Sequence, residues 1–135
     1  IEAQADPKSG YLDRIQVVKG WIDATGETRE RVYDAAWSDD DRLQPDGSLA
    51  GVGSSVDLKT GLTANSIGSP RLTAVWQDPE FDPEQSAFYY VRVLQIPTAR
   101  HSLLDRLALG DEDIDTRRPD TIQERAYTSP IWYRP

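Results

Sequence analysis

Cysteine and methionine are both absent from the 135 residues. Without cysteine the chain can form no disulfide, offer no thiolate nucleophile and build no zinc finger, and the redox compartment stays open. A chain that starts at Ile1 and lacks methionine has no initiator residue, so we expect it to be a piece of a longer translated protein. Its uncharged stretches are also much shorter than the roughly 20 apolar residues that a membrane-spanning helix needs.

Positive charge and histidine are scarce as well. Fifteen Lys and Arg residues face 23 Asp and Glu residues, which gives a net charge of -8 and a pI of about 4.5. Such a surface repels nucleic acid, so we expect no nucleic-acid partner, and we expect no membrane partner either. His101, the single histidine, cannot form a multi-histidine metal site, and no nucleophile elbow of the G-x-S-x-G type accompanies it. The sequence therefore assigns no residue to catalysis, to a cofactor or to a metal.

Large apolar side chains are plentiful, since hydrophobic residues make up 38% of the chain and include four Trp and six Tyr. The length suits one domain over residues 1–135. Apolar residues alternate with period two, which is typical of β-strands. This alternation predicts strands at 12–22, 28–38, 48–58, 71–77, 86–96 and 121–128, of which 48–58 is weakened by two glycines.

One short helix is expected at 103–109, with Ser102 as its cap and Gly110 as its end. The predicted fold class is all-β, an immunoglobulin-like β-sandwich with one short helix. The segment DPEQSAFYYVRV resembles the region of such sandwiches in which a tyrosine hydroxyl bonds to backbone upstream, so Tyr89 or Tyr90 is expected to form this tyrosine corner.

Two acidic clusters have the composition of calcium sites. Asp111, Asp113 and Asp115 alternate like the first ligands of a calcium loop, but Thr116 and Ile122 stand where that loop needs Gly and Glu. A solvated acidic loop is the favoured interpretation. The second cluster comprises Asp39, Asp40, Asp41 and Asp46, and a solvated acidic loop is favoured there too. Glu124, in the last predicted strand, is interpreted as part of a structural ion pair.

The four tryptophans are candidates for a carbohydrate platform, because indole faces stack on sugar rings. Trp21, Trp37 and Trp76 lie within predicted strands at a spacing that suits the core, so core packing is the favoured interpretation for them. Trp132 lies in the aromatic tail at the end of the chain.

Five segments carry a family resemblance: LDRIQVVKGWID (12–23), VYDAAWS, ANSIGSP, FDPEQSAFYYVRVLQIPTAR (81–100) and TIQERAYTSPIWY (121–133). Together they resemble the C-terminal region of the bacterial domain-of-unknown-function family 3604. The resemblance implies a parent protein whose upstream part is similar to metal-dependent hydrolases of the polymerase and histidinol phosphatase superfamily. Those enzymes bind metals through several His and Asp or Glu residues in an α/β barrel. None of these motifs lies in this chain, so any enzymatic activity is expected upstream.

The expected function is that of a non-catalytic accessory module that packs on this upstream domain, stabilising it or shaping the rim of its active site. The expected docking surface comprises Arg125, Tyr127, Trp132 and Tyr133, and such a surface should expose an apolar patch. The alternative is a free-standing carbohydrate- or protein-binding module. Two or more Trp or Tyr rings in one solvent-facing plane would favour that alternative.

Overall fold

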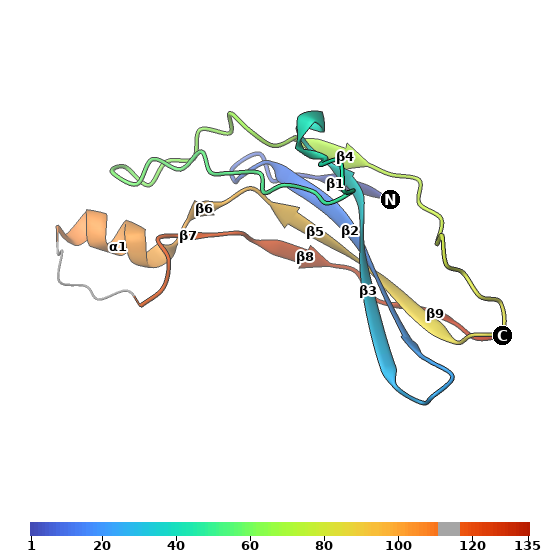
Figure 1. The fold of residues 1–135 in the computed structure, drawn as a ribbon. Helices are drawn as coiled ribbons and strands as arrows, with labels where there is room; N and C mark the ends of the chain where they lie inside the picture. Colours follow the sequence, from blue (N-terminus) through green and yellow to red (C-terminus); the bar gives the residue numbers. More distant parts are fainter. Residues whose placement is uncertain (111–116) are drawn as a thin grey trace.

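The computed structural model describes residues 1–110 and 117–135 and shows an all-β chain with one α-helix, as the fold class predicts (Figure 1). Its main sheet has the strand order β3-β2-β5-β8, and β9 also pairs with β5. The pairs β1–β4 and β6–β7 form two smaller sheets. The strands and helices are β1 (Glu2–Gln4), β2 (Leu12–Ile22), β3 (Thr28–Trp37), the 3₁₀-helix η1 (Asp40–Arg42), β4 (Arg71–Thr73), β5 (Ala87–Gln95), β6 (Thr98–Ala99), α1 (His101–Leu109), β7 (Thr121–Ile122), β8 (Arg125–Tyr127) and β9 (Ile131–Tyr133).

Three long antiparallel strands form the centre of the main sheet, and they confirm the strands predicted at 12–22, 28–38 and 86–96. The middle strand, β2, pairs with β3 on one side and with β5 on the other. Its register with β3 shifts between Ile15 and Gln16, so that one extra residue of β3 lies opposite this point. A shift of this kind is a β-bulge, which increases the local twist of a sheet.

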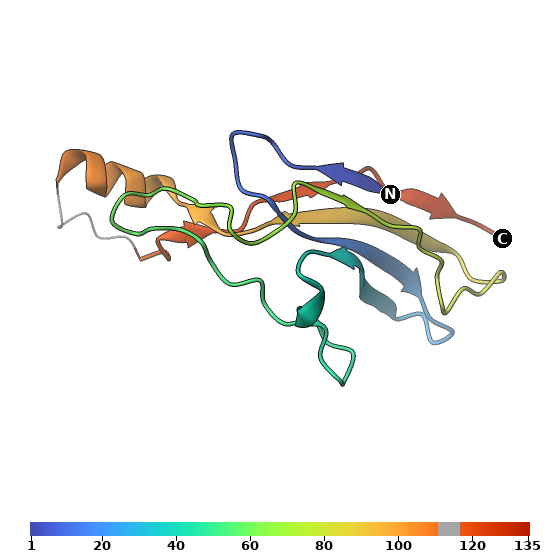
Figure 2. The ribbon, with the colours of Figure 1, turned by 90° about the horizontal axis from the view of Figure 1, so that it is seen from above.

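One face of the main sheet is covered by β1, β4 and the chain that follows β4 (Figures 1 and 2). Leu12, Ile15 and Leu72 form the centre of the core on this side. Alanines of β1 and β3 and valines of β5 pack around them. Trp76 continues the layer, because its ring lies 5.2 Å from the ring of Tyr33 and 6.1 Å from that of Tyr89. Trp76 is half-buried and packs against these two rings, but it is not one of the buried core residues.

Three predicted strands differ from the structure. The segment 48–58 is not a strand and forms only isolated bridges, among them Val56 to Thr63. Gly53 has a φ of +79°, a conformation that breaks an extended strand. The strand predicted at 71–77 ends at Thr73, and the one predicted at 121–128 is divided into β7 and β8.

The helix α1 begins two residues earlier than predicted and ends as predicted. Arg100 is its N-cap, so the prediction that Ser102 caps it was wrong. Gly110 ends it in the left-handed conformation. Leu103 is fully buried, and the side chain of Leu104 lies over Gly61, where a Cβ would approach it to 2.5 Å. Within residues 1–110 and 117–135, no helix has the length and apolar character that crossing a membrane would require.

The predicted tyrosine corner is not formed by Tyr89. Its hydroxyl donates a hydrogen bond of 2.8 Å to the carboxylate of Asp78, not to an upstream backbone group. The segment that covers this face approaches closely enough to supply that carboxylate, and a charged acceptor forms a stronger hydrogen bond than a neutral carbonyl. A hydroxyl-to-backbone bond of this type is made instead by Tyr133, which donates to the carbonyl of Pro83 over 2.9 Å.

Candidate docking surface

The second face of the main sheet, here called the open face, carries large apolar side chains that remain accessible to solvent. Because successive side chains alternate between the two faces, residues paired in register share a face. Phe88 pairs with both Gly20 and Trp132, and Arg92 pairs with Tyr127, so these residues share the open face. The exposed fractions there are 64% for Trp132, 61% for Ile22, 57% for Tyr127 and 40% for Val32.

Four aromatic rings form a continuous row along the open face. The rings of Phe88 and Tyr90 are nearly parallel, with an interplanar angle of 8° and centroids 6.5 Å apart. Trp132 extends the row at one end, 5.3 Å from Phe88, and Tyr127 extends it at the other, 6.2 Å from Tyr90. Three strands contribute to this aromatic row, which comprises Phe88, Tyr90, Tyr127 and Trp132.

Gly20 determines how the row lies on the sheet. A Cβ at this position would lie only 2.2 Å from the ring atom Cζ of Phe88. The absence of a side chain therefore lets the ring of Phe88 lie over the backbone of β2. A glycine inside a strand often marks such a close approach, so Gly20 is a sequence signal by which this arrangement could have been found.

The structure brings together three of the four predicted docking residues. Arg125 pairs with Leu94, and Tyr127 and Trp132 lie on the same face, so all three belong to the open face. Tyr133 pairs with Ala87 and lies on the covered face, where its ring contacts that of Phe81 at 4.9 Å. Two members of the row, Phe88 and Tyr90, were not among the predicted docking residues. Their strand has apolar residues on both faces, so the sequence does not show which face stays open.

Lys19 and Asp78 form a buried ion pair on the covered face. The ammonium of Lys19 donates to the carboxylate of Asp78 at 2.6 Å and to the carbonyl of Glu80 at 2.8 Å, and it lies 5.3 Å from the ring centre of Trp21. Burial opposes ionisation of Asp78, but hydrogen bonds from Lys19, the backbone of Glu80 and Tyr89 outweigh it and lower the pKa of this carboxyl. These contacts attach the segment that follows β4 to the sheet.

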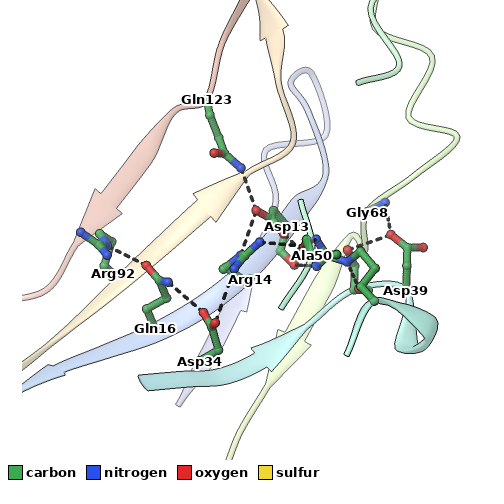
Figure 3. A network of polar contacts seen from close by, with 11 residues as sticks. Asp13, Arg14, Gln16, Asp34, Asp39, Ala50, Gly68, Arg92 and Gln123 are labelled. Atoms are coloured by element: carbon green, nitrogen blue, oxygen red, sulfur yellow. Dashed lines mark hydrogen bonds and ion pairs between the residues drawn. The ribbon is translucent and has the colours of Figure 1, made fainter. Parts of the chain in front are cut away.

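A second buried network lies near the start of β2 (Figure 3). The carboxylate of Asp13, which is 1% exposed, contacts Arg42 at 2.8 Å, Arg14 at 3.1 Å and the amide of Gln123 at 2.7 Å. Arg42 follows β3 and Gln123 precedes β8, so one carboxylate joins three distant parts of the chain. We assign this network to the fold, because the contacts of Asp13 with Arg42 and Gln123 hold distant segments against β2.

The other candidate residues are dispersed in the described structure. His101 is the exposed first residue of α1, and Glu124 is exposed between β7 and β8. No ion pair between residues of 1–110 and 117–135 includes Glu124, so the expected pair is not found there. Within residues 1–110 and 117–135, no three His, Cys, Asp or Glu side chains are grouped for metal binding, and the cluster of Asp39 to Asp46 is no exception. The cluster Asp111, Asp113 and Asp115 lies outside the described residues.

The described strands and this face define the chain as an all-β domain whose main sheet has one covered and one open face. Comparison with protein families then assigns it: the model of the family described as protein of unknown function DUF3604 matches residues 1–135. The chain belongs to this family, as the resemblance indicated. No curated protein and no solved structure matches it.

Proposed function

We propose that this domain, of immunoglobulin-like type, is a non-catalytic accessory module that packs through its open face on an upstream metallohydrolase-like domain of the same chain. The observation that supports the proposal is the exposure of the aromatic row, with Trp132 at 64% and Tyr127 at 57%. Exposed apolar patches of this kind mark interaction surfaces in folded proteins. Aromatic residues are also the side chains most enriched at the centres of interfaces.

The surroundings of the row suit docking. Two parallel rings lie at its centre with a further ring at each end, so a partner would meet a rigid surface that loses little side-chain entropy on binding. Beside the Tyr127 end of the row, Arg92 donates a hydrogen bond of 2.8 Å to Gln16, and Gln16 donates one of 2.8 Å to Asp34. These paired polar groups give the apolar patch a polar margin, which is the usual arrangement of a protein interface.

The experiment that tests this function compares the parent protein with a variant that carries Tyr127→Ser and Trp132→Ser. Hydrolysis of a panel of phosphoesters with added divalent metals and the rate of proteolysis between the two domains are measured together. We expect the variant to release the domain, with faster proteolysis of the connection. The matched control is Leu62→Ser, which removes an apolar side chain that is 70% exposed on a loop away from the sheet. Equal proteolysis of the parent and the variant would contradict the proposal.

A second candidate function is a free-standing carbohydrate-binding module, and the same row favours it, since Trp132 and Tyr127 are open to solvent on one face of the sheet. Titration of the chain with soluble oligosaccharides, followed by tryptophan fluorescence, separates the two functions. Sugar-dependent quenching that Trp132→Ser abolishes would support the binding module over docking. Fluorescence that stays unchanged across the panel would leave docking as the better account.

A further inference from the structure

A groove of about 840 Å³ lies at one end of the aromatic row. It forms where the β2–β3 hairpin extends past the start of β5, because Trp21 is the last residue of β2 that pairs with Ala87, the first residue of β5. Gly20 and Phe88 line it together with Trp132 of β9 and Glu30 of β3. Its size lies within the range of pockets that bind small molecules.

Carboxylates dominate the charged lining of this groove. Asp23 and Arg29 neutralise each other through an ion pair of 2.7 Å. The remaining charged residues of the lining are the carboxylates of Glu30, Asp82 and Glu84 and the guanidinium of Arg134. The groove thus has an excess of negative charge beside an aromatic wall, and the whole chain has the same sign, with a net charge of -8.

Aromatic rings next to carboxylates are the environment that a cation prefers. A guanidinium stacks on the face of an aromatic ring and donates paired hydrogen bonds to a carboxylate, and its charge is complementary to this lining. The covered face shows the same combination at its accessible edge, since Arg31 forms an exposed ion pair with Glu80 and lies 5.7 Å from the ring centre of Tyr33. A neutral sugar would use the ring but gain nothing from the excess charge.

We propose that this groove binds an arginine side chain from a basic segment of a protein partner. The guanidinium lies against Trp132, and Glu30 and Glu84 supply the complementary charge. This inference rests on the proposed docking function and deepens it, because it states the chemistry of the partner surface that meets this end of the open face.

The probe is the blocked peptide acetyl-Gly-Arg-Gly-Arg-Gly-amide, titrated into the isotopically labelled 135-residue chain and followed by NMR. We expect the indole signal of Trp132 and the amide signal of Gly20 to shift, and the affinity to fall as salt is added. The matched peptide with citrulline in place of arginine keeps the shape of the side chain and removes its charge. It should bind at least about threefold more weakly, the factor expected for one exposed ion pair.

Four variants sharpen the test. Trp132→Ser should abolish the shifts, Glu84→Gln should weaken binding by about threefold, and Arg134→Gln should strengthen it by a similar factor. Asp105→Asn, which removes an exposed carboxylate on α1 far along the chain from the groove, should leave the affinity unchanged. Equal affinity for the arginine and citrulline peptides would overturn the inference, as would maltohexaose that shifts the same signals more strongly than the peptide.

The failure of this inference and the failure of docking are distinguishable. If the peptide does not bind but the Tyr127→Ser and Trp132→Ser parent releases its domain, the docking function stands and the arginine assignment is overturned. If the peptide binds but the parent is unchanged, the groove is confirmed as an arginine site and the docking function is wrong.

Discussion

The two faces of the main sheet are built from the same strands, yet they differ in what their aromatic side chains do. Along β5, Tyr89 faces the covered side and donates its hydroxyl to Asp78, whereas its neighbours Phe88 and Tyr90 form the aromatic row on the open side. The composition of the strand is similar on both faces. The difference arises from the segment that follows β4, which covers one face and supplies it with partners.

Ionised groups show the same contrast. On the covered face, Lys19 and Asp78 are nearly fully buried, with side-chain exposures of 3% and 5%, and they form a direct ion pair. On the open face, the charged residues of the groove lie at the margin and remain accessible, as Glu30 and Glu84 do. The covered face thus depends on its charges for its structure, while the open face has charges available for a partner.

The largest expected effect comes from breaking the buried ion pair. Lys19→Met leaves the carboxylate of Asp78 buried without its cation, which should lower the free energy of unfolding by about 3–5 kcal/mol. Urea denaturation followed by circular dichroism measures the loss. The double variant with Asp78→Asn removes the uncompensated charge and should recover at least half of the loss. If Lys19→Met costs less than about 1 kcal/mol, the pair does not hold the cover on this face.

A smaller effect is expected from Gly20→Ala, which changes the open face alone. The added methyl group would displace the ring of Phe88, and overpacking of this kind costs about 1–3 kcal/mol. Urea denaturation measures the cost, and the combination with Phe88→Ala is the control. Because the methyl group then meets no ring, the double variant should lose less stability than the sum of the two single variants. Strict additivity would show that the ring does not lie over Gly20.

The sequence predicted the strands and the helix that follow from local alternation. It missed the elements that depend on contacts between segments far apart in the chain. The three long strands follow from period two, and α1 follows from its leucines and Gly110. Strand β1 was not predicted, because a three-residue strand exists only where β4 lies beside it. Segment 48–58 has apolar residues at strand spacing, yet it lacks a partner strand, and its glycines favour turns.

The candidate site was predicted in part for the same reason. Tyr127 and Trp132 stood out because an aromatic tail is unusual, and the structure places both on the open face. Phe88 and Tyr90 did not stand out, since an apolar strand is compatible with two covered faces or with one. Whether one face or both faces of the strand are covered depends on how the layers pack. No local pattern encodes which face a distant segment will cover.

Alkaline pH should weaken the covered face by a modest amount. Burial, followed by the hydrogen bond to Glu80, raises the pKa of Tyr33 to about 12, above the value of about 10 for an unfolded chain. A raised pKa means that the folded state holds the proton more tightly, so this stabilisation is complete below pH 10 and is lost as the pH rises towards 12. Tyr33→Phe should therefore flatten the decline between pH 9 and 11 by about 1 kcal/mol or less, since the group is partly accessible to solvent. Urea denaturation at both pH values tests this, and identical declines for the two proteins would contradict it.

The smallest effect on stability should come from the open face itself. Tyr127→Ser removes an exposed ring whose described ring contact is with Tyr90, and surface changes of this kind usually alter the free energy of unfolding by about 0.5 kcal/mol or less. The same variant should reduce the fluorescence of a bound apolar dye such as ANS, because it interrupts the aromatic row. Leu62→Ser, the control on a loop, should leave the dye signal unchanged. A large loss of stability in Tyr127→Ser would mean that this face is part of the core, and the contrast between the two faces would fail.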